Sequence, residues 1–221
     1  MATTRKKLPI EEADTRARIL AAATEVFASI GYAGARVDEI AARAGVNKAM
    51  LYYHVGDKER LYATVLTDTI DRVPPVLRAA LENVDTPAEK LKCILETLAS
   101  FGTNHPHFVP IMLREIASGG VTLPDEMLVR MAGIFRVVAD VLAEGMAEGE
   151  FRAVDPLLTH VTLIGSMLFL IASRPIRARV GKIAGVPQEH TLDELANHTF
   201  NLMLHGLETG AAPKPKRKQK K

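Results

Sequence analysis

The chain has 221 residues, 48% of them hydrophobic, with no Trp and a single Cys, Cys93, which excludes an internal disulfide. No apolar run is long enough to cross a bilayer and no secretory signal precedes the first amphipathic segment, so we expect a cytoplasmic protein without membrane contact. A formal net charge of +2 is too small to indicate a nucleic-acid partner by itself, and the length allows one sizeable core or two modest ones.

Positive charge is concentrated at the two ends of the chain. Residues 1–60 hold 10 Lys and Arg against 8 Asp and Glu, residues 61–212 hold 12 against 18, and residues 213–221 hold 6 against none. Attraction to phosphate must therefore come from the ends and from local faces. We predict a flexible basic N-terminus over residues 1–12 and a disordered basic tail over residues 211–221. The tail could add sequence-independent affinity for DNA or simply keep the protein in solution.

The first predicted helix runs from about Asp14 to Ile30 and braces the motif that follows. Its apolar residues recur at helical spacing and form one stripe. The members of this stripe are Ile19, Leu20, Ala23, Val26, Phe27 and Ile30.

The segment from Val37 to Gly56 has the pattern of a helix-turn-helix. In its first helix the apolar residues follow the i, i+3, i+4, i+7 rule. They are Val37, Ile40, Ala41 and Ala44. Gly45 provides the backbone freedom that favours a helix end, and Asn47 is placed to cap the next helix.

The second helix of the motif is short and dense in Lys, Tyr and His. Leu51 and Val55 lie four residues apart and can pack inward together with Val46. The other side chains then spread over the outer surface, which is the arrangement of a helix presented to DNA. This outer surface is the candidate reading head.

At this point the sequence resembles the TetR-type transcriptional regulators. Four motifs typical of that family occur in order: F-x-x-x-G-[YF] at Phe27–Tyr32, I-A-x-x-A-G-V at Ile40–Val46, L-Y-x-H-F at Leu51–Val55 and D-K-E-x-L at Asp57–Leu61. The chain departs from the family pattern at Arg36, where Thr is usual, at Ala49 and Met50, and at Val55, where Phe is usual. The resemblance covers about the first third of the chain.

The resemblance implies an all-α fold with two domains. Residues 13–61 would form the three-helix, helix-turn-helix DNA-binding domain, and residues 62–210 a helical effector-binding and dimerisation domain. It further implies a homodimer that reads a palindromic double-stranded DNA operator and is released by a small-molecule inducer, with repression as the usual outcome.

The outward side chains of the motif are the candidate DNA contacts. They are Arg36, Asn47, Lys48, Ala49, Met50, Tyr52, Tyr53, His54 and Lys58. Most are expected on the DNA backbone, whereas base edges should meet Lys48, Ala49, Met50 and Tyr53. Lys48 could donate to guanine, and Ala49 and Met50 could touch thymine methyl groups. Two alternatives stay open: Tyr52 could pack against the first helix, and His54 could cap its own helix.

Six further helices complete a prediction of about nine. Their expected starts are Asp57; Thr86, with Pro87 and Glu89 in a capping box; Pro106 to Pro110; Pro124; Asp155 with Pro156; and Thr191, with Glu194 three residues later. Pro74 and Pro75 should kink or end the fourth helix, and Gly119 and Gly120 should end the sixth.

The last two helices are unusually apolar for surface elements. A helix that is apolar on more than one face must be covered on more than one face. The second cover could come from the same helices of another subunit, which is also the dimer interface that the resemblance implies. The alternative is a central position in a monomer.

The resemblance places an inducer pocket in the middle of the chain, enclosed by helices four to eight. Candidate lining residues are Phe101, His105, Phe108, Met112, Arg114, Phe135, Met167 and Phe169. Their soft side chains suit a small apolar or amphipathic effector, although ordinary core packing is the alternative for each. We expect Arg114 and Glu115 to be exposed on their helix, with an anionic ligand of Arg114 as the alternative.

Enzymatic function has no support in the sequence. It contains no phosphate loop, nucleotide-binding glycine pattern, nucleophile elbow or metal motif, so no cofactor or metal is expected. A second rival is a helical small-molecule-binding module whose helix-turn-helix is purely structural. The exposed Lys and Tyr residues argue against it, because a structural turn does not need them.

Overall fold

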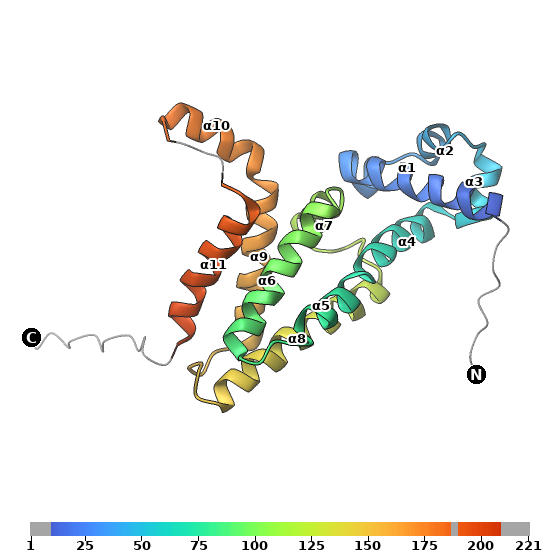
Figure 1. The fold of residues 1–221 in the computed structure, drawn as a ribbon. Helices are drawn as coiled ribbons and strands as arrows, with labels where there is room; N and C mark the ends of the chain where they lie inside the picture. Colours follow the sequence, from blue (N-terminus) through green and yellow to red (C-terminus); the bar gives the residue numbers. More distant parts are fainter. Residues whose placement is uncertain (1–9, 187–189, 209–221) are drawn as a thin grey trace, which may run out of the picture. The chain divides into compact units, whose positions relative to one another are not determined.

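The computed structural model describes residues 10–186 and 190–208, and within them the chain is all-helical (Figure 1). Of the predicted flexible N-terminus, residues 10–12 are helical and belong to the first helix; residues 1–9 and the predicted tail lie outside the described residues. The helices are α1 (Ile10–Gly34), α2 (Val37–Ala44), α3 (Lys48–Val55), α4 (Lys58–Ile70), α5 (Val73–Leu81), α6 (Pro87–Asn104), α7 (Phe108–Ala117), α8 (Asp125–Ala147), α9 (Pro156–Ala172), α10 (Arg174–Ala184) and α11 (Leu192–Leu207).

Two helices more than the predicted nine occur among the described residues. Pro74 and Pro75 separate α4 from the next helix as expected, but they also stand in the first turn of α5. Pro175 similarly stands in the first turn of α10. Proline lacks an N–H that a first helical turn does not need, so it ends one helix and is tolerated at the start of another. The prediction of nine helices rests on the first property alone.

Side-chain caps occur at several of the predicted helix starts. Asp155 accepts a hydrogen bond from the N–H of Leu158 at 2.8 Å at the start of α9. At α11 the side chains of Thr191 and Glu194 each accept from the other residue's backbone N–H, which makes a complete capping box. These bonds satisfy N–H groups that have no partner within the helix.

The chain divides into two compact units. The N-terminal unit comprises residues 1–72 and 104–131, and the C-terminal unit comprises residues 73–103 and 132–221. In terms of packing, α4 and α7 therefore belong with the first three helices. These units are defined by packing. The boundary that the sequence predicts between residues 61 and 62, which separates the DNA-binding from the effector-binding domain, stays a prediction.

Helix α1 is the centre of the N-terminal unit, since it contacts α2, α3, α4 and α7. Of the predicted stripe, Ile19, Ala23, Val26 and Phe27 are buried, whereas Ile30 is exposed. The helix is interrupted at Gly31, whose φ of 73° lies in the left-handed region. Ile30 stands just before this interruption, so its side chain leaves the buried face.

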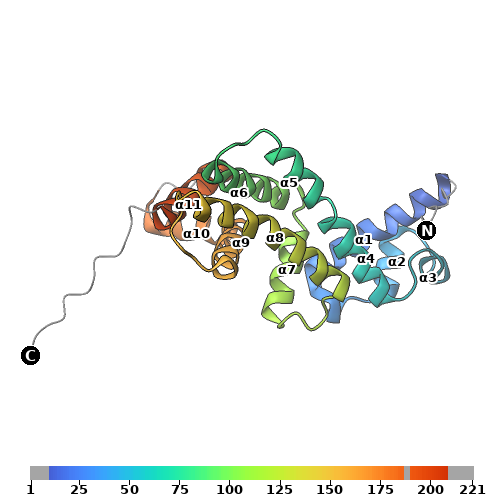
Figure 2. The same cartoon turned by 90° about the horizontal axis from the view of Figure 1, so that it is seen from below.

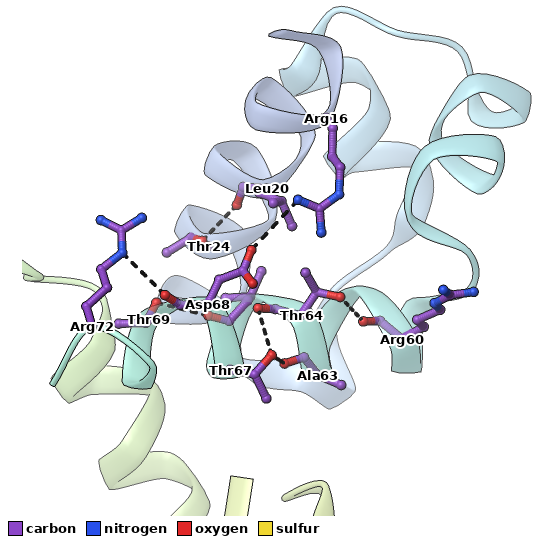
Figure 3. Close-up of polar contacts among 11 residues, drawn as sticks. Arg16, Leu20, Thr24, Arg60, Ala63, Thr64, Thr67, Asp68, Thr69 and Arg72 are labelled. Atoms are coloured by element: carbon purple, nitrogen blue, oxygen red, sulfur yellow. Dashed lines mark hydrogen bonds and ion pairs between the residues drawn. The ribbon is translucent and has the colours of Figure 1, made fainter. Parts of the chain in front are cut away.

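Apolar burial, and not polar contact, holds α4 against α1. The ion pair between Arg16 and Asp68 spans 3.9 Å and is exposed, so it contributes little (Figure 3). The hydroxyls of Thr64, Thr67 and Thr69 donate to carbonyls of α4 itself (Figure 3). The apolar side chains of α4 that are buried are Leu61, Val65, Leu66 and Ile70.

In the C-terminal unit, α9 lies beside α11 (Figures 1 and 2). The segment between α8 and α9 is joined to the end of α11. Phe151 and Glu208 form an antiparallel bridge there, and the N–H of Arg152 donates to the carbonyl of Leu207 at 2.7 Å. Lys90 of α6 and Glu144 of α8 form an ion pair of 2.6 Å. No single helix in the described part could span a membrane; only α9 and α10 together, bent by 66°, have the length and composition.

Two glycines of α8 provide a test of packing in the C-terminal unit. A methyl group on Gly145 would overlap the ring of Phe151, which is 2% exposed, whereas one on Gly133 would meet no atom within 4 Å. We expect Gly145→Ala to lower the free energy of unfolding in urea by about 1–3 kcal/mol. Gly133→Ala, the matched control, should leave it unchanged or raise it by about 0.5–1 kcal/mol. Equal values for both variants would contradict the packing of Phe151 on α8.

Candidate nucleic-acid interface

The turn between α2 and α3 has the geometry that the sequence predicted. Gly45 ends α2 with φ of 66°, in the left-handed region. Its N–H donates to the carbonyl of Ala42 at 3.1 Å, and the N–H of Val46 donates to that of Ala41 at 3.0 Å. These bonds satisfy the last carbonyls of α2 and turn the chain toward α3.

Asn47 caps α3 as expected. Its Oδ1 accepts a hydrogen bond from the N–H of Met50 at 2.8 Å. The cap fixes where α3 begins, and it leaves the amide Nδ2 of Asn47 to donate elsewhere. Asn47 therefore serves the fold and is still available to a phosphate oxygen.

Helix α3 is held by its two buried residues. Leu51 and Val55 are buried, as are Ile40, Ala41 and Ala44 of α2. Because these side chains point into the unit, the remaining residues of α3 must point away from it. The predicted inward and outward faces of the helix-turn-helix are confirmed.

The outer surface of α3 is open to solvent. Tyr53 is 77% exposed, and Tyr52 and Met50 are 44% and 41% exposed. Arg36, Asn47, Lys48 and Ala49 are exposed as well, whereas His54 and Lys58 are half-buried. All nine candidate DNA contacts thus lie on one short segment at or near the surface. Which of them meets a phosphate and which a base stays a prediction.

Lys48 has a partner that the sequence analysis missed. Its ammonium lies 3.0 Å from Oδ1 and 3.2 Å from Oδ2 of Asp38, the second residue of α2. The hydrogen bond that Lys48 donates to Asp38 and the negative charge of that carboxylate raise the pKa of Lys48. Asp38 stands ten residues earlier, a separation that no helical spacing rule connects; the turn alone brings the two together.

Lys58 is positioned by an aromatic ring. Its ammonium lies 4.5 Å from the ring centroid of Tyr32, at the end of α1. The pKa of Tyr32 is raised by burial and then by the nearby carboxylates of Glu59 and Asp57, so the phenol stays neutral. The contact holds Lys58 at the start of α4, next to the end of α3.

The candidate effector residues fall into both units. His105, Phe108, Met112 and Arg114 belong to the N-terminal unit, and Phe101, Phe135, Met167 and Phe169 to the C-terminal unit. Within the N-terminal unit, His105 and Phe108 line a cavity of about 170 Å³. Its other lining residues are Thr24, Val65, Leu66, Thr69, Asn104, Pro106, His107 and Ile111. A role in effector binding stays a prediction for all eight candidate effector residues.

The C-terminal members differ in their surroundings. Phe101 and Met167 are buried, whereas Phe169 is 67% exposed. The ring of Phe135 meets the imidazole of His160 edge-on, with centroids 5.4 Å apart. Burial lowers the pKa of His160, and its Nδ1 has no hydrogen-bond partner among the described residues.

The expected exposure of Arg114 and Glu115 is right for the first and wrong for the second. Arg114 is exposed, and its guanidinium donates to the carbonyl of Ser29 at 2.6 Å. Glu115 is buried at 3% exposure and accepts from the hydroxyl of Tyr62 at 2.5 Å. Tyr62 lies 53 residues earlier in the chain, so a local pattern on α7 could not reveal the donor.

Two family models match the chain. The model described as bacterial regulatory proteins of the tetR family matches residues 19–65. The model described as a tetracyclin repressor-like C-terminal domain matches residues 87–203, more than half of the chain. The first match covers the whole helix-turn-helix, and the second covers most of the helices that follow it.

Individual proteins agree with these models. The transcriptional repressor NicS of Pseudomonas putida is 30% identical over 170 residues, which cover 74% of this chain and 78% of NicS. The transcriptional activator FasR of Mycolicibacterium smegmatis is 39% identical over 95 residues, 43% of this chain and 42% of FasR. The structure of FadR from Bacillus subtilis in complex with stearoyl-CoA superimposes with a TM-score of 0.71 at 20% identity, over 86% of this chain and 98% of FadR. That last likeness concerns the fold alone. Taken with the geometry of α2 and α3, the matches establish that the chain belongs to the TetR family of DNA-binding transcriptional regulators, which are not enzymes.

Proposed function

We propose that the protein is a cytoplasmic, ligand-responsive repressor that binds a palindromic operator as a homodimer and leaves it when a small molecule binds. The observation that carries the proposal is the outer face of α3, which presents a lysine, two tyrosines and a methionine to solvent. A purely structural helix-turn-helix would gain nothing from this exposure.

On this proposal α3 enters the major groove. Lys48 donates to guanine, while Ala49 and Met50 touch thymine methyl groups. Asn47 and Lys58, at the two ends of the segment, donate to phosphate oxygens and set the register. Lys48 must then exchange Asp38 for its DNA partner, so Asp38 lowers affinity for any site that offers Lys48 no acceptor.

Dimerisation is supported by apolar side chains that nothing in the described part of the C-terminal unit covers. The exposed ones on α9 and α11 are Leu157, Leu158, Val161, Phe169 and Leu202. Exposed apolar side chains on two neighbouring helices support a protein interface there. A two-fold pairing through these helices would present two copies of α3 to successive turns of DNA.

Repression is supported by NicS, a repressor that this chain matches over three quarters of its length. Activation is the second candidate, because FasR is an activator and is more similar in sequence over a shorter segment. Reporter expression from the protein's own operator, with and without the protein, separates the two outcomes.

The proposed effector is small and apolar or amphipathic, and acyl-CoA thioesters are the class to test first. FadR, which shares the fold, binds stearoyl-CoA. In this chain the candidate lining residues Phe101 and Met167 are buried and apolar, and the buried Nδ1 of His160 offers a polar partner. Such a mixture suits an acyl chain with one polar group.

Binding to selected operator DNA tests the role of Lys48. We expect Lys48→Ala to weaken operator binding about ten-fold and binding to random DNA only about two-fold, since a base contact carries the specificity. Asp38→Asn, the matched variant, removes the opposing carboxylate and should tighten binding to random DNA by about three-fold. Equal losses on both DNAs for Lys48→Ala, measured by fluorescence anisotropy, would assign Lys48 to phosphate. Absence of any operator in a random selection would overturn the proposed function.

Sedimentation velocity at micromolar concentration tests the dimer. The wild-type protein should sediment as a dimer, and Phe169→Glu should give monomers, because a charge would be buried against the partner. Val129→Glu changes an equally exposed apolar residue of α8, in the N-terminal unit, and should leave the dimer intact. A monomeric wild-type protein would rule out the two-fold model.

Release of operator DNA by acyl-CoA tests the effector class. Stearoyl-CoA should raise the melting temperature and displace the protein from its operator, since a ligand that binds the folded protein stabilises it by mass action. Coenzyme A alone should do neither, because it lacks the acyl chain. If acetyl-CoA and stearoyl-CoA both leave a bound operator undisturbed, the effector belongs to another class.

A further inference from the structure

Glu115 is a buried carboxylate that joins three parts of the N-terminal unit. Its Oε1 accepts hydrogen bonds from the hydroxyl of Tyr62 in α4 and from that of Thr122 in the loop after α7, each at 2.5 Å. Its Oε2 is also buried and has no hydrogen-bond partner among the described residues. A carboxylate that is only half satisfied is expensive to bury, so it calls for an explanation other than stability.

Tyr62 connects this carboxylate to the DNA-binding segment. The Tyr62 ring is 2% exposed and lies against Phe27 edge-on at 4.8 Å and against Tyr32 at 4.9 Å, measured between centroids. Tyr32 in turn carries the ammonium of Lys58 on its ring. A continuous series of contacts therefore runs from α7, through α4 and the end of α1, to a candidate phosphate contact.

A second tie from α7 ends at the same place. Arg114 donates to the carbonyl of Ser29, two residues before the interruption of α1 at Gly31. The last carbonyls of a helix have no hydrogen-bond donor within the helix, and the guanidinium of Arg114 donates to one of these carbonyls. Neighbouring residues of α7 thus hold both α1 and α4.

A cavity lies beside these hydrogen bonds and is lined by both α4 and α7. The cavity of about 170 Å³ is lined by Val65, Leu66 and Thr69 of α4 and by Phe108 and Ile111 of α7. These residues stand three, four and seven positions from Tyr62 and four and seven from Glu115, which places them on the same helix faces. Beside this cavity, the directional hydrogen bond between Tyr62 and Glu115 is a contact that can hold α4 and α7 at a fixed distance.

We propose that Glu115 is a positioning residue for DNA recognition: by holding Tyr62 and Thr122 together it fixes α4 and α7 in the arrangement that sets Lys58 and α3 for operator binding. The inference rests on the DNA-binding function and goes beyond it, since Glu115 is buried and touches no DNA. Without these bonds α4 and α7 adopt several arrangements, of which only one is competent to bind the operator. The apparent affinity for operator DNA then falls in proportion to the population of that arrangement.

A stable but less specific variant is the decisive test. The triple variant Tyr62→Phe, Glu115→Met, Thr122→Val removes the whole polar group with little change in volume, and such replacements often leave stability unchanged or raise it. We expect an unchanged or higher midpoint of urea unfolding and an operator affinity about ten-fold lower, with binding to random DNA nearly unchanged. The control Lys90→Met, Glu144→Met removes a comparable ion pair from the C-terminal unit and should leave operator affinity unchanged.

Two single variants guard against trivial outcomes. Glu115→Gln keeps an acceptor for both hydroxyls and should retain wild-type operator affinity, whereas Glu115→Met should not. Ratios to the wild-type protein are compared throughout, so a protein that binds no operator at all would overturn the proposed function and not this inference. A folded triple variant with wild-type operator affinity would overturn the inference. Losses on operator and random DNA that merely follow the folded fraction would assign Glu115 to stability alone.

Discussion

The burial of Leu51 and Val55 is the constraint on which the DNA-binding surface depends. An isolated helix of eight residues would not be stable in water, so α3 exists only because these two side chains pack into the unit and Asn47 caps its start. The same burial decides the direction of every other side chain of α3. The packing of Leu51 and Val55 therefore both stabilises α3 and presents its outer side chains, so a change in one also alters the other.

The charges around this face moderate its affinity. Lys48 is paired with Asp38, and the guanidinium of Arg43 lies 2.8 Å from Oε1 of Glu39. Both cations therefore already have a carboxylate partner in the free protein. In the proposed binding mode Lys48 exchanges Asp38 for a phosphate or a base edge, so its net contribution to DNA affinity is smaller than that of an unpaired cation.

The allocation of α7 to the N-terminal unit bears on how a signal could reach the DNA-binding surface. Arg114 and Glu115 tie α7 to α1 and α4 by bonds within one compact unit. A change that reaches α7 therefore acts on the helices that carry α3. The contact between α7 and α4 contains a carboxylate of which one oxygen has no partner among the described residues, and it lies beside a cavity. It is therefore held by fewer contacts than the apolar core around Phe27 and is easier to shift.

Local sequence patterns determined a large part of this protein. The apolar spacing of Ile40, Ala41 and Ala44, the Gly45 turn and the caps at Asn47, Asp155 and Thr191 are short-range features, so the all-α fold and the outward face of α3 followed from the residues alone. Only the tertiary structure decided which distant groups meet. The pairs Lys48 with Asp38, Lys58 with Tyr32, and Glu115 with Tyr62 join residues on different helices, and no periodicity along one helix records the approach of another. For the same reason a charged residue on α7 that looked like a surface group proved to be buried.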